Sequence, residues 1–339
     1  MKLIIQIPCL NEAETLPGTL RDIPRSIPGV DAVEILVIDD GSRDGTSEVA
    51  RQHGVEHVVR FPRRRGLASA FSAGLDAALK LGADIIVNTD GDNQYAGGDI
   101  PRLIAPLLDG DADVVIGDRN VQDLDSMSPM KKRLQRLGSW VVRQVSDTQV
   151  PDTTSGFRAY TRDAALRLTI VSDFSYTLES IIQAGKKRIA IAHVPIRTNP
   201  RTRKSRLFSS VWTYVKTSAA TIVRIYAMYE PLKVFGLIGL MVFLAGVAIT
   251  ARFVYYFLGG AGQGHVQSLI VSAVLMIVGF QIALIGLVAD VISGNRKLIE
   301  DLLYRVRRME LAPSAGGTRG DERRAGDPLS RDKRGELRG

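Results

Sequence analysis

Two long apolar stretches near the C-terminal end constrain the fold of this chain more than any other feature of its sequence. Residues 234–257 contain one charged side chain, Arg252, and residues 266–289 contain none. Each stretch matches the roughly 20 residues that a helix needs to cross the hydrocarbon core of a bilayer. Two core helices of a globular domain are the alternative, which the length and the near absence of charge disfavour. The sequence therefore predicts two membrane-spanning helices.

The charges around these stretches predict how the pair is oriented. Lys233 precedes the pair, residues 258–265 between the stretches contain no Lys or Arg, and five basic residues follow: Arg296, Lys297, Arg305, Arg307 and Arg308. Basic residues stay on the cytoplasmic side of a membrane, so both ends are expected in the cytoplasm. We assign residues 233–292 to a transmembrane hairpin. Residues 293–339 are assigned to a basic cytoplasmic tail that we expect to be disordered, because its end lacks apolar periodicity.

Residues 1–206 alternate short β-branched runs with helical stretches. The expected strands are 3–8, 34–39, 57–61, 84–89, 113–117 and 188–195, and the expected helices are 12–23, 45–53, 67–81 and 100–108. Asn11 with Glu14 resembles a capping box, and Gly54 suits a helix end. The pattern predicts an α/β domain with a mostly parallel sheet. Ligands of such sheets bind beyond the carboxyl ends of the strands.

The basic character of the chain points to an anionic partner. The formal net charge is +8, and basic residues gather at 197–206 and after residue 296, beside apolar stretches. This placement favours anionic lipid or phosphate over nucleic acid. Residues 207–232 between them have helical apolar spacing, which predicts an amphipathic helix at the membrane surface. A core-packing helix of the soluble domain is the alternative.

Carboxylates follow two of the expected strands. Asp39 and Asp40 end one strand, and Asp90 and Asp92 end another. Either motif alone could be turn chemistry, but two acidic turns at one edge of a parallel sheet indicate a site. A nucleotide diphosphate would be repelled by bare carboxylates, unless Mg²⁺ or Mn²⁺ bridges them. The sequence therefore predicts a metal-dependent site for a nucleotide-sugar.

Other common sites find no support in the sequence. It has no Gly-rich dinucleotide fingerprint, no phosphate-binding Gly-Lys-Ser/Thr loop and no Cys/His cluster with metal spacing.

Several motifs together resemble those of family 2 glycosyltransferases, which have the GT-A fold. They are IPCLNE at 7–12, VIDDGSRDGT at 37–46, DGDNQ at 90–94, GDRN at 117–120 and TSGFRAY at 154–160. The closer likeness is to the polyprenyl-phosphate branch, which includes the dolichol-phosphate mannose and glucose synthases. The resemblance covers residues 1–233 and extends loosely through the hairpin.

The resemblance implies a role for each matching residue. It assigns Pro8, Asn11 and Glu12 to nucleotide binding, Asp39 and Asp40 to the base and ribose, and Asp90 and Asp92 to Mg²⁺ or Mn²⁺, with Asp90 beside the nucleotide and Gln94 near the metal or acceptor phosphate. The Gln-x-x-Arg-Trp motif of processive synthases is not matched by the segment from Gln135 to Trp140. This difference favours the transfer of a single sugar, and we expect in-line attack on the anomeric carbon to make the transfer an inverting one.

The expected acceptor is a lipid monophosphate, which is already a nucleophile and needs positive charge rather than a base. Arginine suits this task because its planar fork matches phosphate oxygens. The candidates are Arg119, Arg133, Arg136, Arg158 and Arg203, although any one of them could be solvated surface charge. Asp152 resembles a proposed catalytic carboxylate in relatives, but it could equally orient an arginine.

Three readings of function stay open at this point. The favoured one is a cytoplasmic-face enzyme of the plasma membrane, or of the endoplasmic reticulum in a eukaryote, that loads one sugar onto polyprenyl phosphate. The others are a tethered glycosyltransferase with a carbohydrate or different lipid acceptor, and a membrane scaffold without catalysis. The sequence discloses neither the sugar nor the base of the donor, and it leaves homo-oligomer formation open.

Overall fold

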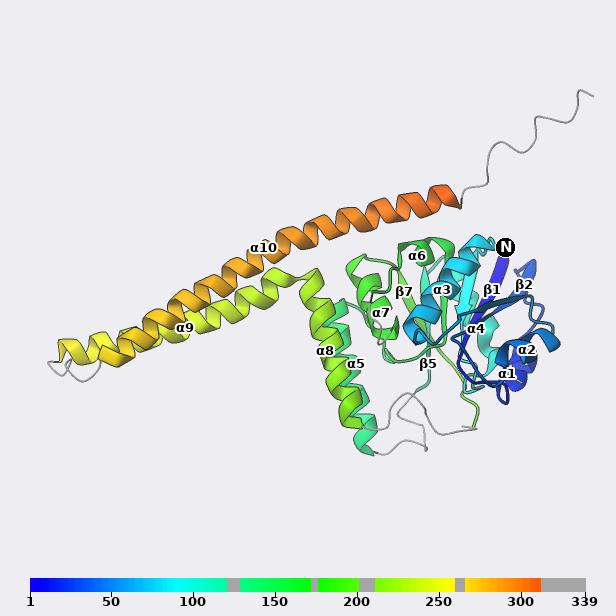
Figure 1. Cartoon of the computed structure of the whole chain (residues 1–339), viewed down its shortest axis with the longest axis horizontal. Coiled ribbons are helices and arrows are strands. Elements are labelled where there is room, and N and C mark those ends of the chain that lie inside the picture. Colours follow the sequence, from blue (N-terminus) through cyan, green and yellow to red (C-terminus); the bar gives the residue numbers. More distant parts are fainter. Residues whose placement is uncertain (121–128, 172–175, 201–210, 260–265, 312–339) are drawn as a thin grey trace, which may run out of the picture.

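The computed structural model shows a long helical hairpin that projects from an α/β domain (Figure 1). It describes residues 1–120, 129–171, 176–200, 211–259 and 266–311.

A seven-stranded sheet forms the centre of the α/β domain. Its order is β3-β2-β1-β4-β6-β5-β7, and only β6 runs antiparallel to its neighbours β4 and β5. The strands are β1 (Lys2–Cys9), β2 (Ala32–Asp39), β3 (His57–Arg60), β4 (Ile85–Asn88), β5 (Val114–Asp118), β6 (Arg158–Thr161) and β7 (Ile191–Pro195). The predicted mostly parallel α/β fold is confirmed.

Helices cover both faces of this sheet. They are α1 (Leu16–Asp22), α2 (Thr46–Gln52), α3 (Leu67–Lys80), α4 (Ile100–Leu108), α5 (Pro129–Ser146), α6 (Arg162–Arg167) and α7 (Tyr176–Lys186), with a short 3₁₀ turn η1 (Gly97–Asp99). In β1, Ile4 packs into the core on the α3 side, and Ile5 packs into the core on the opposite side. Both side chains are fully buried, which explains why the central strands are apolar at consecutive positions.

Two local expectations at the start of the domain had different outcomes. The capping box of Asn11 and Glu14 is wrong, because α1 begins only at Leu16 and Asn11 adopts a left-handed backbone with φ of 55°. The helix end at Gly54 is confirmed: α2 stops at Gln52, and Gly54 has φ of 73°, which favours glycine. Strand β6 was not predicted, since its four residues include a charged one and show no run of apolar side chains.

Three long helices follow the sheet domain: α8 (Val211–Tyr229), α9 (Pro231–Leu258) and α10 (Val266–Glu310). Helices α9 and α10 are long and apolar enough to cross a membrane. The predicted disordered tail from residue 293 is wrong in its first part, because α10 continues to Glu310. The expected disorder after Ala312 lies outside the described residues.

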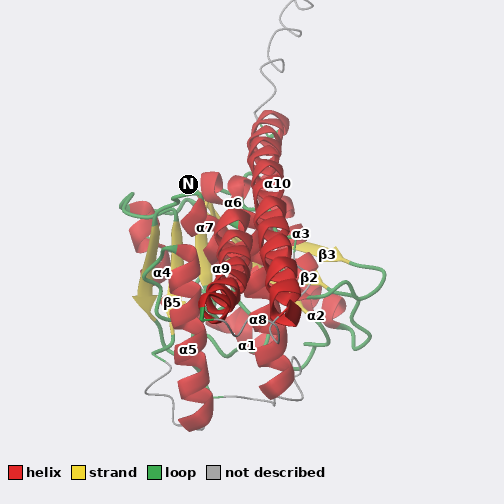
Figure 2. Cartoon of the chain, turned by 90° about the vertical axis from the view of Figure 1, so that its left-hand side faces the viewer, coloured by secondary structure: helices red, strands yellow, loops and turns green. Residues whose placement is uncertain are grey.

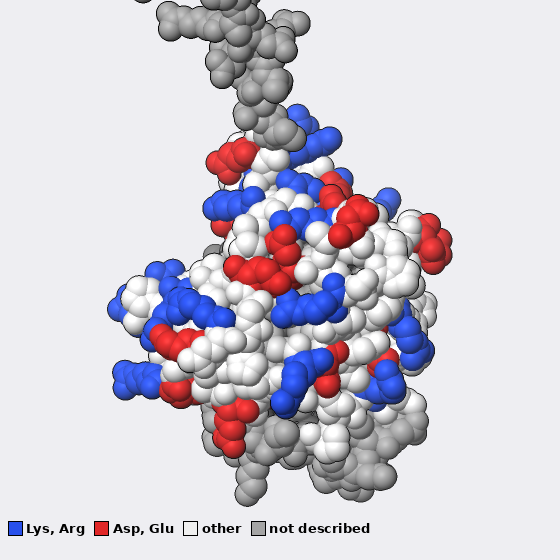
Figure 3. All heavy atoms as spheres, turned by 90° about the vertical axis from the view of Figure 1, so that its right-hand side faces the viewer, with Lys and Arg blue, Asp and Glu red and all other residues white. Residues whose placement is uncertain are grey.

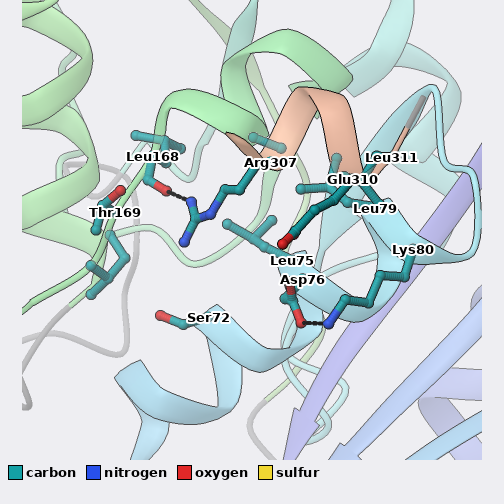
Figure 4. A pocket seen from close by; sticks show the side chains of 12 residues that line it. Ser72, Leu75, Asp76, Leu79, Lys80, Leu168, Thr169, Arg307, Glu310 and Leu311 are labelled. Atoms are coloured by element: carbon teal, nitrogen blue, oxygen red, sulfur yellow. Dashed lines mark hydrogen bonds and ion pairs between the residues drawn. The ribbon is translucent and has the colours of Figure 1, made fainter. Parts of the chain in front are cut away.

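The end of α10 stays helical because it packs on the sheet domain. Lys187 pairs with Glu300 at 3.0 Å, and the hydroxyl of Tyr304 donates to Asp163 at 2.6 Å. Arg307 donates to the backbone oxygen of Leu168 at 3.2 Å. Figure 4 shows this arginine beside a small hollow between α3, α6 and the last turn of α10. These contacts tie the membrane hairpin to the domain.

Glycines allow α9 and α10 to pack closely. A Cβ on Gly239 would lie 2.6 Å from the backbone oxygen of Gly279, and a Cβ on Gly246 would lie 2.8 Å from that of Ser272. Membrane helices associate through small residues of this kind, because lipid offers no hydrophobic drive for larger ones to associate.

We expect Gly239→Ala to destabilise the hairpin by about 1–3 kcal/mol, since the added methyl group overpacks the helix contact. Gly236→Ala is the matched control, because its Cβ would meet only Leu232 at 4.0 Å. Thermal unfolding of both variants in detergent tests this prediction. Equal melting temperatures would contradict it.

Candidate active site

The loops that follow β1 and β2 lie against one another at the carboxyl edge of the sheet. The backbone N–H of Asn11 donates to Ser42 Oγ at 2.9 Å, and the N–H of Arg43 donates back to Asn11 Oδ1 at 2.9 Å. The N–H of Glu12 donates to Thr46 Oγ1 at 3.0 Å. These hydrogen bonds fix two of the loops predicted to hold the nucleotide.

The loop after β4 joins the other two. Its Gly91 oxygen accepts hydrogen bonds from Thr15 at 3.0 Å and Thr19 at 3.2 Å. A Cβ on Gly91 would lie 2.9 Å from Cys9 Sγ, at the end of β1. The ends of three neighbouring strands therefore converge, and Pro8 and Glu12 lie in the same region, as the sequence predicts.

Asp39 and Asp40 are buried, and their carboxylates accept hydrogen bonds that fix the neighbouring loops. Asp39 accepts hydrogen bonds from the N–H of Ser42 at 2.7 Å and from the Ser47 hydroxyl. Asp40 accepts from the N–H groups of Arg65 at 2.6 Å and Gly66 at 2.9 Å. Each carboxylate oxygen has two lone pairs, so these bonds leave acceptor capacity for a ligand.

Asp92 lies close enough to Asp90 for its negative charge to act on the Asp90 carboxyl. Burial, together with the negative charge of Asp92, raises the pKa of Asp90 to about 7. Asp92 accepts hydrogen bonds from Gln94, from its N–H at 3.2 Å and its Nε2 at 2.7 Å. Two carboxylates that lie close together in a partly buried setting form a donor set that a hard divalent cation would stabilise.

This donor set is small. Within the described residues, no group of three or more His, Cys, Asp and Glu is arranged to hold a metal ion. Mg²⁺ ordinarily keeps several waters and binds through one or two carboxylates together with substrate phosphates, so a pair of aspartates fits such an ion.

A buried polar network lies next to Asp90. Asn88 donates through Nδ2 to the oxygen of Gly156 at 2.7 Å and to the Tyr176 hydroxyl at 3.0 Å, and the N–H of Gly156 donates to the Tyr95 hydroxyl at 2.9 Å. A Cβ on Gly156 would lie 3.1 Å from Asp90 Oδ1. No local pattern indicated a role for Asn88, Tyr95 or Tyr176, because they meet only in the folded sheet.

Arg119 and Asp152 form a buried bidentate ion pair. Arg119 Nε lies 2.7 Å from Asp152 Oδ2, and Nη2 lies 3.0 Å from Oδ1. Arg119 also donates to Thr154 Oγ1 at 2.8 Å. Burial disfavours the charge of Asp152, but the neighbouring guanidinium outweighs burial and lowers the pKa of that carboxyl. Of the two roles predicted for Asp152, this geometry favours the orientation of an arginine.

Comparison with known proteins identifies the family of this site. Residues 4–169 match the family model described as glycosyl transferase family 2, and residues 230–294 match one described as the GtrB C-terminal hairpin. An undecaprenyl-phosphate mannosyltransferase of Micrococcus luteus is 30% identical over 206 residues, which are 58% of this chain and 83% of that protein. The chain belongs to glycosyltransferase family 2.

Two further similarities cover more of the chain. Glycosyltransferase AglJ of Haloferax volcanii is 28% identical over 310 residues, which are 88% of this family 2 enzyme and 97% of that protein. The solved structure of glucosyl-3-phosphoglycerate synthase from Mycobacterium tuberculosis with Mn²⁺, UDP-glucose and phosphoglyceric acid has a TM-score of 0.54 at 22% identity, over 67% of this chain and 80% of that one. This likeness confirms the GT-A fold.

Four more arginines were predicted to contact the acceptor phosphate, and the structure describes the positions of three of them. The expectation that Arg158 contacts the acceptor phosphate is not supported, because its side chain is fully buried. Its guanidinium donates to the backbone oxygens of Ser155, Thr177 and Thr153 and to the Ser180 hydroxyl. Arg133 and Arg136 lie on α5, and Arg203 lies outside the described residues. A local pattern does not reveal whether an arginine faces inward.

We expect Gly156→Ala to lower kcat of this glycosyltransferase about 100-fold, because the new methyl group displaces the Asp90 carboxylate. Its Cβ would lie 2.9 Å from the Tyr176 hydroxyl and 3.1 Å from Asp90. Gly138→Ala on α5 is the matched control, with no described atom within 4 Å of its Cβ. Initial rates across a Mn²⁺ titration test this prediction, and a normal rate from a folded Gly156→Ala variant would refute it.

Proposed function

We propose that the enzyme transfers one sugar, with inversion, from a UDP- or GDP-sugar to polyprenyl phosphate at the cytoplasmic membrane face. The observation that carries this proposal is that a pair of carboxylates and an arginine lie near each other at one edge of the sheet. The Asp90 and Asp92 carboxylates suit a metal-bound diphosphate, and segment 152–156 links them to a fixed cation, Arg119. Relatives named as an undecaprenyl-phosphate mannosyltransferase and a polyprenol monophosphomannose synthase support the acceptor class.

On the donor side, Asp90 and Asp92 would hold Mg²⁺ or Mn²⁺, which neutralises charge on the nucleotide diphosphate as it leaves. Mn²⁺ accompanies UDP-glucose in the structural neighbour from Mycobacterium tuberculosis. Gln94 orients Asp92 through its two hydrogen bonds. Pro8, Asn11, Glu12, Asp39 and Asp40 form the walls that receive the base and ribose.

On the acceptor side, Arg119 offers positive charge to the lipid phosphate, with Arg133, Arg136 and Arg203 as further candidates. A phosphate oxygen attacks the anomeric carbon, the new carbon–oxygen bond forms, and the bond to the nucleotide diphosphate breaks on the opposite side. The phosphate carries enough negative charge to attack without a general base. Asp152 is therefore a positioning residue, which holds the guanidinium in place for this step.

The helices near the membrane support a lipid acceptor. Helix α8 leads directly into α9 and contacts α5, and both α5 and α8 extend below the sheet in the view of Figure 2. Exposed residues on these two helices include Trp140, Val223 and Arg224, a mixture of aromatic, apolar and basic side chains that suits a headgroup layer with anionic lipids.

On one face of the domain, away from these helices, the surface charges are of mixed sign. On the face of the domain drawn in Figure 3, basic and acidic side chains are interspersed. Nucleic-acid binding calls for basic residues clustered on one face.

We expect Asp92→Ala to abolish sugar transfer while the melting temperature stays near that of the parent protein. The substitution removes one of two carboxylates proposed to hold the metal. Asp76→Ala on α3 is the matched control, because Asp76 is exposed and pairs only with Lys80 among described residues. Normal activity from folded Asp92→Ala protein would contradict the assignment of Asp92 as a metal ligand.

Arg119→Lys is expected to lower kcat/KM for the lipid acceptor by about 10- to 100-fold, the equivalent of one charge-assisted hydrogen bond. A lysine cannot keep the bidentate pairing with Asp152 while it also meets phosphate. KM for the nucleotide-sugar should change little. Arg102→Lys, an exposed site on α4, is the control. A selective rise in donor KM would place Arg119 on the nucleotide instead.

Purified enzyme with Mn²⁺ or Mg²⁺, a short polyprenyl phosphate and a panel of UDP- and GDP-sugars tests the whole reaction. We expect metal-dependent addition of one sugar to the lipid, detected by mass spectrometry. Transfer to a carbohydrate or another lipid, with none to polyprenyl phosphate, would establish a different acceptor. Absence of nucleotide-sugar binding would favour a scaffold.

A further inference from the structure

Helix α10 carries β-branched side chains at every seventh position over most of its length. They are Val271, Val278, Ile285, Ile292, Ile299 and Val306. A second set follows three residues after each of them, namely Val274, Gln281, Val288, Asn295, Leu302 and Met309. All twelve side chains are exposed. This 3,4 spacing is the heptad pattern of a coiled coil, with the first set at the a positions and the second at the d positions. We call these twelve residues the heptad stripe.

A different face of α10 makes the contacts within the chain. Gly279 and Gly286 pack on α9, and Ser293 donates to the backbone oxygen of Met228 at 3.0 Å. Glu300 and Arg307 then contact the sheet domain. These five positions also repeat every seven residues, so one face is covered along the helix while the heptad stripe remains uncovered.

The membrane accounts for only part of the heptad stripe. Helix α10 has 45 residues, which span roughly 68 Å at about 1.5 Å per residue, whereas the hydrocarbon core is about 30 Å thick. The predicted span ends near residue 289, so the stripe from Ile292 to Met309 extends into water. There Ile299 is 64% exposed, Leu302 60% and Met309 69%. An apolar strip of this kind in water marks an interaction surface.

We propose that the heptad stripe pairs with the same stripe of a second copy of this chain in a parallel two-stranded coiled coil. β-branched residues at a favour two parallel strands where leucine stands at d, and Leu302 provides this combination in the part of the stripe beyond the span. Two copies in one membrane share one orientation, so their α10 helices can only run parallel. This inference goes beyond the proposed function, and uses it only for the membrane orientation.

Charge and polarity at the edge of the stripe support this partner. In a parallel pair, Arg305 at a g position lies opposite Glu310 of the second copy at an e position, and the symmetry of the pair repeats this contact. Gln281 is exposed on the span and has no hydrogen-bond partner among the described residues. Side-by-side pairing lets Gln281 and Asn295 each meet its own counterpart, which sets the register.

The paired surface lies away from the candidate active site. The end of α10 contacts α6, which follows the antiparallel strand β6 at the amino edge of the parallel strands, whereas Asp90 and Asp92 follow β4 at the carboxyl edge. Pairing therefore leaves the site open, and loss of pairing is expected to leave sugar transfer in place. The two hypotheses can then fail separately.

Cysteine cross-linking of the full-length protein in native membranes tests the pairing. We expect Ile299→Cys and Leu302→Cys to form disulfide-linked dimers under mild oxidation, while Asp301→Cys and Arg308→Cys, on the same helix but outside the stripe, do not. The parent protein controls for Cys9, which is buried. Absent dimers, or equal cross-linking at all four positions, would overturn the proposal.

A charge exchange provides a second test that does not depend on cysteine. Arg305→Glu is expected to lower the dimer fraction of protein in lipid nanodiscs, measured by mass photometry, because it places two acidic residues opposite each other. Adding Glu310→Arg should restore the dimer, and the rescue separates repulsion from a folding defect. An unchanged dimer fraction in the single variant, or no rescue in the double variant, would refute the parallel register.

Discussion

The hydrogen bond from the Asn88 side chain to the backbone oxygen of Gly156 holds the two halves of the candidate site together. Asn88 ends β4 just before Asp90, and Gly156 precedes β6, the one antiparallel strand. Because segment 152–156 also carries Asp152, this contact sets the position of Arg119 relative to the Asp90 carboxylate. A shift of this buried amide would move the proposed metal ligands and the proposed acceptor cation apart, and catalysis of transfer between two anions depends on their spacing.

A second constraint connects this site to the membrane. Side-chain contacts join the hairpin to the sheet domain. Tyr229 and Lys187 both contact Glu300 where α8, α7 and α10 meet. The ion pair between Lys187 and Glu300 is largely shielded from water, and Tyr304 and Arg307 extend the contact for further turns. The domain is thereby held at a defined angle to the spans. The lipid phosphate that we propose as the acceptor would require such an angle, because a lipid phosphate stays in the headgroup layer.

Much of this arrangement was predictable from local patterns. The six parallel strands, the first helices between them and both apolar spans follow from periodicity and length. Strand β6 escaped prediction because four residues with a buried arginine resemble no strand pattern, and the helical end of α10 escaped because its stability comes from contacts with the sheet domain. The arginines show the same limit: Arg119 and Arg158 both follow or begin a strand, yet one lines the site and the other is a fully buried structural residue.

The sequence by itself determined the family 2 motifs, the paired carboxylates at strand ends and the two spans, because each of these depends on residues that are neighbours in the chain or repeat at a fixed period. Only the tertiary structure decided which groups meet across the sheet. Asn88, Tyr95, Gly156 and Tyr176 come from distant segments, and their hydrogen bonds exist only once β6 has inserted beside β4. It also decided that Asp152 orients Arg119, since an ion pair 33 residues apart in the chain depends on the path of the backbone between them.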